Sequence, residues 1–277
     1  MDTKIKDRVV LVTGASGGIG AAIARQLAEE GARVILHYRS NAEAARQLQG
    51  EIGAKRSLLV KADLAQEDQV IDAIVRARTW GGRIDTLIAN AGSWESREVP
   101  LHRMSLQQWQ RTHAAVLTSG FLCLREFLKI VARQKRGNAV LIASTAAIFG
   151  EAGHADYAAA KAAMAFGLTR SLKNEIARIA PGTSTYCGGR INCVCPGWTV
   201  VPRTAGQLRH LATLRRVLAT RSLRRVARPE DIANAVVFLA SDHLAGHLTG
   251  QILAVAGGME GRLLWEPSEI DPTLALG

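Results

Sequence analysis

Residues 8–20 constrain the fold of this chain more than any other stretch, because a short apolar run there passes directly into a glycine-rich turn. Residues 8–13 read RVVLVT, a β-branched run suited to a strand that is buried on both faces. Gly14, Gly18 and Gly20 follow with the spacing G-x-x-x-G-x-G, and an alanine-rich stretch typical of a helix comes next. Small residues let the backbone approach a pyrophosphate, and a helix N-terminus offers unpaired N–H groups to it. The segment therefore predicts a nucleotide-binding strand, turn and helix.

The same alternation of strand and helix patterns continues along the chain. Further strands are expected at 32–40, 57–64, 84–92, 138–143, 190–197 and 250–258, and helices at about 42–52, 66–79, 105–135, 157–180, 203–220 and 229–240. Such alternation predicts an α/β fold with a doubly wound parallel sheet of the Rossmann type. We expect one domain over residues 1–277, with a substrate lid at about 200–227 and a weakly patterned C-terminal tail at about 259–277.

The end of the second expected strand bears on the choice of cofactor. An acidic residue there binds the ribose 2′-hydroxyl of NAD, whereas an arginine suits the 2′-phosphate of NADP. The sequence has Tyr38, Arg39 and Ser40 at this point, and no acid. It therefore favours NADP(H) over NAD(H).

Several polar or small residues follow other expected strands, at the edge where ligands bind in such sheets. They are Asp63, the Asn90-Ala91-Gly92 turn, Ser144 and Pro196. Tyr157 and Lys161 lie four residues apart on an expected helix, which places both on one face. A phenol has a pKa near 10 and exchanges a proton poorly at neutral pH unless a cation stabilises its phenolate. Lys161 is the candidate for that cation.

The net charge of +11 is unevenly distributed. Seven arginines crowd into residues 209–228, a segment that suits phosphates, an acidic carrier protein or nucleic acid, or simply a solvated helix face. The segment lacks aromatic residues for base stacking, so we favour the solvated face and consider nucleic-acid binding unlikely.

Other features place the chain among soluble globular proteins. The N-terminus shows no secretory signal and no run is long enough to span a membrane, so we expect a cytoplasmic protein. Cys123, Cys187, Cys193 and Cys195 form no C-x-x-C pair, so neither a metal site nor a disulfide framework is expected. The alternating Cys193 and Cys195 are interpreted as buried core thiols.

Taken together, these motifs resemble the short-chain dehydrogenase/reductase family. The matching pieces are TGASGGIG at 13–20, Asp63-Leu64, ANAG at 89–92, Ser144, Y-x-x-x-K at 157–161, CPG at 195–197, and the stretches 228–242 and 248–258. The resemblance covers about residues 5–258, and the spacing from Ser144 to Tyr157 is similar to that of bacterial 3-oxoacyl-carrier-protein reductases.

The resemblance implies roles for particular residues. Tyr157 would be the general acid in carbonyl reduction, Lys161 would lower its pKa and bind the nicotinamide ribose, and Ser144 would hydrogen-bond the substrate carbonyl. The implied cofactor-binding residues are Gly14, Ser16, Gly18, Ile19, Gly20, Tyr38, Arg39, Ser40, Asp63, Leu64, Asn90, Ala91, Gly92, Tyr157, Lys161, Pro196, Gly197 and Thr199. The expected substrate pocket consists of Trp94, Phe149, His154 and Trp198. Family members usually form dimers or tetramers, so a homodimer or homotetramer is expected.

Four residues depart from the family pattern. Val116 stands where relatives often have an asparagine, seven residues after a tryptophan, that anchors a proton relay; His113 and Thr118 are nearby alternatives. Val201 replaces a threonine that contacts the carboxamide, which leaves Thr199 or Thr204 for that role. Gly17 replaces a basic residue, and Ala256 replaces an aspartate near the last glycines.

The sequence thus predicts an NADPH-dependent enzyme that reduces a ketone or aldehyde to an alcohol. The alternative is an NADP-binding protein that uses the same fold as a sensor, a scaffold or a non-redox catalyst, and Val116 is the residue that most supports it.

Overall fold

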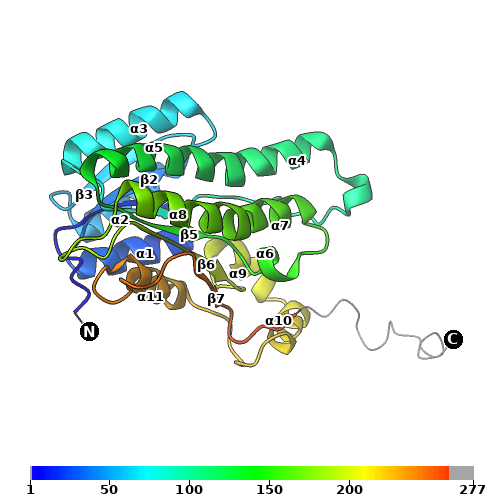
Figure 1. Ribbon diagram of the computed structural model, residues 1–277. Helices are drawn as coiled ribbons and strands as arrows, with labels where there is room; N and C mark the ends of the chain where they lie inside the picture. The colour runs from blue at the N-terminus through cyan, green and yellow to red at the C-terminus, as the bar shows by residue number, and fades with distance from the viewer. Residues whose placement is uncertain (1, 262–277) are drawn as a thin grey trace, which may run out of the picture.

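A computed structural model describes residues 2–261 and shows one seven-stranded parallel sheet between two layers of helices (Figure 1). The strand order is β3-β2-β1-β4-β5-β6-β7, so the chain starts in the middle of the sheet and winds outward in both directions. The strands are β1 (Val9–Val12), β2 (Arg33–Tyr38), β3 (Ser57–Lys61), β4 (Thr86–Ala89), β5 (Asn138–Ile142), β6 (Arg190–Pro196) and β7 (Ile252–Val255). This confirms the predicted α/β, doubly wound, Rossmann-type single domain.

The helices cover both faces of this sheet. One layer contains α3 (Glu67–Gly81), α4 (Leu106–His113), α5 (Ser119–Gln134), α7 (Ala155–Ala162) and α8 (Thr169–Ile179), above the sheet in Figure 1. The other layer contains α1 (Gly18–Glu29), α2 (Ala42–Ile52) and α11 (Pro229–Ala240). Short elements complete the chain: η1 (Leu101–Arg103), α6 (Ala146–Phe149), α9 (Pro202–Leu208) and α10 (Leu211–Ala219).

The sheet is apolar on both faces because each layer packs on alternate strand residues. Val9 and Leu11 belong to the core beneath α3 and α5, whereas Val10 and Val12 belong to the core beneath α1 and α11. Burial on both faces explains why the strands read as continuous apolar runs.

Two expected helices are interrupted. The expected helix 105–135 contains a π-helical segment, η2 (Ala114–Thr118), and the helix after Tyr157 contains another, η3 (Ala163–Leu168). The expected helix 203–220 is in fact two helices, because the chain breaks between α9 and α10 at residues 209–210. The predicted tail at 259–277 lies outside the described residues from 262 onward.

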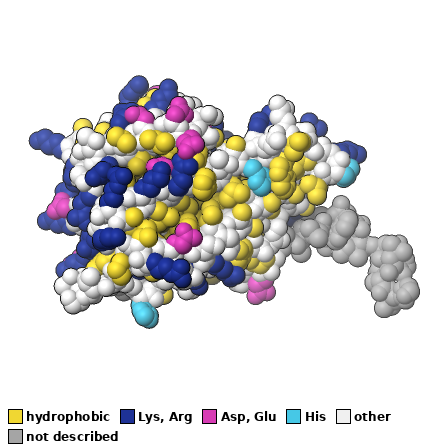
Figure 2. Space-filling model, turned by 45° about the horizontal axis from the view of Figure 1, so that its top comes forward, with side chains coloured by type: hydrophobic (Ala, Val, Ile, Leu, Met, Phe, Trp, Pro, Cys, Tyr) yellow, Lys and Arg dark blue, Asp and Glu magenta, His cyan; other side chains and the backbone are white. Residues whose placement is uncertain are grey.

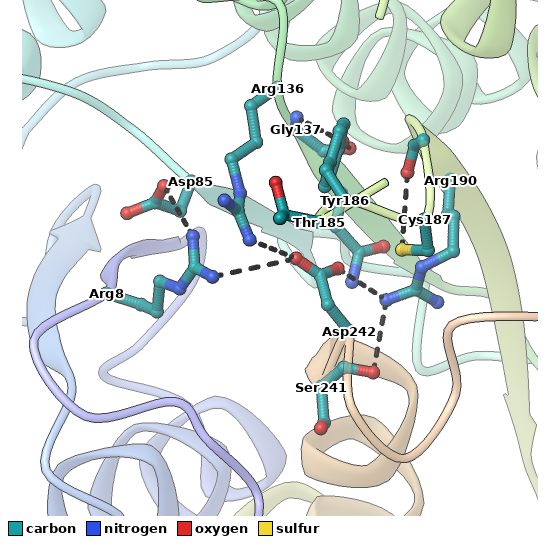
Figure 3. A network of polar contacts seen from close by, with 12 residues as sticks. Arg8, Asp85, Arg136, Gly137, Thr185, Tyr186, Cys187, Arg190, Ser241 and Asp242 are labelled. Atoms are coloured by element: carbon teal, nitrogen blue, oxygen red, sulfur yellow. Dashed lines mark hydrogen bonds and ion pairs between the residues drawn. The ribbon is translucent and has the colours of Figure 1, made fainter. Parts of the chain in front are cut away.

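A network of ion pairs and hydrogen bonds closes the amino edge of the sheet (Figure 3). The Asp242 carboxylate accepts hydrogen bonds from Arg136 and Arg190, each at 3.0 Å. Arg190 also donates to the backbone carbonyls of Leu239, Ser241, Ala245 and Leu248. The network joins the starts of β5 and β6 to the end of α11. Within residues 2–261, no helix combines the length and the apolarity needed to cross a membrane.

Candidate active site

The glycine-rich turn after β1 is held by a buried histidine that the sequence analysis missed. His37 Nδ1 accepts a hydrogen bond from the Gly14 N–H at 3.0 Å, and Nε2 lies 3.0 Å from the Ala62 carbonyl, to which it donates. Burial lowers the pKa of His37 to about 4, so the ring is neutral and its tautomer is fixed by these two partners. The polar His37, directly after the apolar residues 34–36, was the available signal.

Backbone crowding explains why this turn needs glycine. A Cβ on Gly20 would lie 2.3 Å from the Gly14 carbonyl oxygen and 2.7 Å from Asn90 Nδ2. Asn90 Nδ2 donates to the carbonyls of Thr13, at 3.0 Å, and Gly14, at 3.2 Å, so it ties the turn after β4 to the turn after β1. Helix α1 begins at Gly18 with no side-chain cap and no acidic residue in its first turn. Its N-terminal N–H groups are therefore available to an anion.

A cavity of about 430 Å³ opens at this helix terminus. Its lining includes most of the predicted cofactor residues: Gly14, Ser16, Gly18, Ile19, Gly20, Arg39, Ser40, Asp63, Leu64, Asn90, Ala91 and Gly92. The predicted cofactor residues outside this lining are Tyr38, Tyr157, Lys161, Pro196, Gly197 and Thr199, whereas Val201, Pro202 and Arg203, which were not predicted, belong to it. The uncapped helix and the glycine cradle fit a dinucleotide, with its pyrophosphate at Gly18 and its adenosine ribose near Arg39.

Ser144, Tyr157 and Lys161 come together at the carboxyl end of β5. Ser144 follows the strand by two residues, and its side chain lies close enough to Tyr157 on α7 to lower the pKa of the phenol. Lys161 Nζ donates to the Ile142 carbonyl at 2.6 Å and lies 5.8 Å from the centre of the Tyr157 ring. The predicted hydroxyl, phenol and amine therefore share one site.

The pKa values of this group differ from the expectation. Burial raises the pKa of Tyr157 to about 12, and the hydrogen bond from Ser144 and the charge of Arg203 offset only part of that rise. Burial lowers the pKa of Lys161 to about 8. The expected depression of the phenol pKa by Lys161 is thus absent in this arrangement, because the ammonium is bound to a carbonyl instead of the phenol oxygen.

The helix that carries Tyr157 is fixed from behind by a buried aspartate. Asp156 is 1% exposed, and its carboxylate accepts hydrogen bonds from Thr112 Oγ1 at 2.6 Å and from Gln108 Nε2 at 3.3 Å. Both donors belong to α4, so the carboxylate joins α4 to the first turn of α7. The contact keeps Tyr157 in a fixed position relative to the sheet.

An apolar wall lies beside Lys161. A Cβ built on Gly92 would lie 3.4 Å from Lys161 Nζ and 3.6 Å from Val116 Cγ2, so the ammonium and the valine methyl group both lie next to Gly92. Neither alternative for the missing asparagine reaches it: His113 stacks on Trp109 at 4.3 Å, and Thr118 is exposed. Valine at 116 therefore leaves Lys161 with a single hydrogen bond, to Ile142, among the described residues.

The segment after β6 covers the glycine turn. A Cβ on Gly18 would lie 2.6 Å from Val201 Cγ1, so Val201 packs directly on the turn. The two threonine alternatives are used within the segment: Thr199 Oγ1 donates to the Gly197 carbonyl at 2.9 Å, and Thr204 Oγ1 donates to the Thr199 carbonyl at 2.5 Å. Ala256 lies against Gly197, because a Cβ on Gly197 would come 3.0 Å from Ala256 Cβ.

The four expected pocket residues are separated. Trp94 contacts Tyr157, with ring centres 5.5 Å apart, and the guanidinium carbon of Arg203 lies 4.6 Å from the centre of the Trp94 ring. Phe149 lines a different cavity of about 490 Å³ with Glu151 and Ala155. His154 occupies the N-cap position of α7 without a side-chain capping bond. Its buried Nδ1 has no hydrogen-bond partner among the described residues. Trp198 is half-buried.

The fold and this site define a dinucleotide-binding α/β oxidoreductase. The family model described as enoyl-(acyl carrier protein) reductase matches residues 14–260. The chain belongs to the short-chain dehydrogenase/reductase family.

Its relatives are named as dehydrogenases and reductases. The chain is 38% identical to a cis-4-hydroxycyclohexanecarboxylate dehydrogenase of Sinomonas cyclohexanicum over 93% of this chain and 98% of that protein. It is 35% identical to a 3-oxoacyl-[acyl-carrier-protein] reductase of Synechocystis sp., again over 93% and 98%. A solved structure from Agrobacterium tumefaciens superposes with a TM-score of 0.85 at 28% identity, over 94% of this chain and 98% of that one.

Proposed function

We propose that this chain is an NADPH-dependent reductase of ketones or aldehydes, reversible in principle, with Ser144, Tyr157 and Lys161 as its catalytic residues. The observation that carries the proposal is the meeting of these three side chains beside the dinucleotide cavity. A bound nicotinamide would supply the hydride.

The residues divide the proton chemistry between them. The substrate oxygen accepts hydrogen bonds from Ser144 Oγ and the Tyr157 hydroxyl, which orients the carbonyl and disperses its developing negative charge. Tyr157 then donates its proton to that oxygen. With a pKa of about 12 the phenol keeps its proton throughout the neutral range. The Lys161 ammonium, present below about pH 8, would have to contact the phenol oxygen instead of the Ile142 carbonyl to stabilise the phenolate that the transfer leaves.

Cofactor preference rests on Arg39. Arg39 and Ser40 are exposed after β2 and line the cavity, and no acidic side chain occupies the end of that strand. An arginine at this point pairs with a 2′-phosphate and offers nothing specific to a free 2′-hydroxyl. Arg39→Ala is expected to weaken NADPH binding about tenfold and leave NADH binding unchanged, which fluorescence titration of both cofactors measures.

The chain is proposed to assemble as a homodimer or homotetramer in the cytoplasm. Figure 2 shows hydrophobic side chains in the middle of one face, between groups of lysine and arginine. Phe121 of α5 and Phe166 of η3 are 45% and 37% exposed, more than large apolar side chains usually are. Light scattering of the wild type and of Phe166→Glu tests whether this face joins two copies, and a wild-type monomer would contradict it.

The central test is Tyr157→Phe. It removes one oxygen, so NADPH binding should persist while NADPH oxidation by a carbonyl substrate falls by about 10²–10⁴-fold. Tyr186→Phe is the matched control, because among residues 2–261 the Tyr186 hydroxyl hydrogen-bonds only to the backbone of Gly137, at the other edge of the sheet.

The assay uses purified protein, NADPH and a panel of ketones. The relative from Sinomonas cyclohexanicum is named for a hydroxyl on a ring that bears a carboxylate, so 4-oxocyclohexanecarboxylate is the first compound. Undiminished activity in Tyr157→Phe would sink the mechanism. NADPH binding without oxidation by any carbonyl compound would favour the non-redox alternative.

A further inference from the structure

The charged side chains of the proposed lid, residues 200–227, are all positive. Residues 176–229 contain no aspartate or glutamate, and eight arginines fall between positions 203 and 228. Arg225 is nevertheless paired, because it holds the Asp231 carboxylate through two hydrogen bonds. Arg203 differs: no hydrogen bond or ion pair joins its guanidinium to another residue of the described chain.

Arg203 lies at the catalytic site. It belongs to the first turn of α9, lines the dinucleotide cavity, and places its guanidinium carbon 4.6 Å from the centre of the Trp94 ring. Trp94 in turn contacts the ring of Tyr157. Arg203 is also close enough for its charge to act on Tyr157. The guanidinium is therefore one aromatic ring away from the group that donates the proton.

Stacking on Trp94 prepares this guanidinium for an anion. The cation–π contact uses the flat face of the guanidinium, so its N–H donors remain free around its edge. These donors match the two oxygens of a carboxylate, and a preoriented fork loses less conformational entropy on binding than a free side chain. The contact with Trp94 thus orients the Arg203 guanidinium. Because no carboxylate of the described chain pairs with it, its N–H donors remain available to a ligand.

The geometry also limits the distance between the anion and the reacting carbonyl. The ring contacts of 5.5 and 4.6 Å put the guanidinium within about 10 Å of the Tyr157 ring centre. A substrate that touches both groups carries its anion only a few bonds from its carbonyl. A phosphate at the end of a long carrier arm is too distant to do so.

We propose that Arg203, held by Trp94, binds a carboxylate of the substrate, and that the enzyme acts on compact oxo acids and the corresponding hydroxy acids. The inference rests on the proposed carbonyl reduction and adds the substrate class. It makes Arg203 a specificity-determining residue that contacts substrate and takes no part in proton transfer.

The experiment compares an acid with its neutral analogue. NADPH oxidation is measured with 4-oxocyclohexanecarboxylate and with its methyl ester, for the wild type and for Arg203→Met. A charge-assisted hydrogen bond contributes about 1.5–3 kcal/mol, so kcat/KM for the acid should fall about 10- to 100-fold in the variant. The value for the ester should change less than about twofold, which also shows that the catalytic residues are intact. Arg209→Met is the matched control on the same lid, exposed and without an aromatic contact.

Each other result overturns the inference in a distinguishable way. Equal losses for acid and ester would show that Arg203 only packs on Trp94. A weaker NADPH affinity with an unchanged acid-to-ester ratio would assign Arg203 to the cofactor. Faster reduction of dihydroxyacetone phosphate than of the acid would show that Arg203 recognises a phosphate of the substrate and not a carboxylate. A wild type that reduces the ester but not the acid overturns this inference alone, whereas one that reduces neither overturns the proposed reduction as well.

Discussion

The two edges of the sheet each bury a cation, and the cations have opposite surroundings. At the amino edge Arg190 is 2% exposed and donates five hydrogen bonds, four to backbone carbonyls and one to Asp242. Figure 3 shows those to Ser241 and Asp242. At the carboxyl edge Lys161 is 3% exposed and donates one, to Ile142. The same burial therefore leaves one cation with five hydrogen bonds, its Nε alone lacking a partner among the described residues, and the other cation with a single hydrogen bond.

This difference separates a structural cation from a chemical one. A buried charge whose donors are occupied stabilises the fold and is not available for anything else. A buried charge with few partners costs stability, and its pKa shifts, as that of Lys161 does to about 8. Proteins retain such groups where a substrate or cofactor completes their interactions.

The largest expected effect tests the carboxyl edge. Lys161→Met should lower kcat/KM for carbonyl reduction by about 10²–10⁴-fold, because the phenolate of Tyr157 loses its cation. The melting temperature should stay the same or rise, since the variant no longer buries a poorly compensated charge. Thermal unfolding and NADPH oxidation of the same preparation measure both. A large drop in melting temperature would show that Lys161 stabilises the fold, as Arg190 does, and the two edges would then no longer differ in this respect.

The next effect belongs to the amino edge. Arg190→Met leaves four carbonyls and part of Asp242 without their donor, so the free energy of unfolding should fall by about 3–5 kcal/mol. Urea unfolding measures it, with Arg25→Met as the control, because the exposed Arg25–Glu51 pair contributes about 0–1 kcal/mol. The activity per folded molecule should not change. Lost activity in fully folded Arg190→Met would show that this edge also serves the site.

A third prediction uses the pH dependence of Lys161. The ammonium is lost as pH rises through about 8, so kcat/KM for reduction should fall roughly tenfold per pH unit above that value. Tyr157 does not titrate in this range, because its pKa is about 12. Lys161→Arg keeps its charge and should remove this fall. A fall that persists in the arginine variant would belong to another group.

The free energy of unfolding should also depend on the titration of Lys161, but it should rise with pH where kcat/KM falls. The pKa of Lys161 in the folded chain lies below its ordinary value of 10.5, so the unfolded state binds more protons between about pH 8 and 10.5. The contribution of this lysine to stability therefore rises with pH across that window. The difference in unfolding free energy between wild type and Lys161→Met, measured at pH 7 and pH 10, isolates it; a difference that does not change with pH would contradict the shift.

The smallest effect tests the apolar wall beside Lys161. Val116→Asn places an amide next to the ammonium and should stabilise its charged form, so the fall in kcat/KM should move to higher pH by less than about one unit. The rate below pH 7 should change only severalfold. Val116→Ala, which removes methyl groups without adding a polar atom, is the control. An equal shift in both variants would assign the effect to packing.

Local pattern was sufficient for most of the fold and for proposing the catalytic residues. The strand, turn and helix at 8–20 and the Tyr157–Lys161 spacing depend on neighbours in sequence, so the chain alone reveals them. The break at residues 209–210 was not predicted, because the arginine-rich stretch is compatible with one helix. Trp94, Phe149, His154 and Trp198 were grouped from their places after strands, but side-chain direction in loops depends on packing. Of the four, Trp94 is the one with a ring contact to Tyr157 in the described part of the chain.

The sequence by itself determined a parallel α/β sheet, a glycine turn for a dinucleotide and a Ser, Tyr and Lys set, since each follows from short-range spacing and residue chemistry. Tertiary structure alone decided how these groups are partnered. Arg190 and Lys161 are both cations in or beside buried strands. Only the folded chain shows that Arg190 donates five hydrogen bonds and Lys161 donates one. Likewise, only packing placed Arg203 against Trp94, because the two are over one hundred residues apart and meet through a single ring contact.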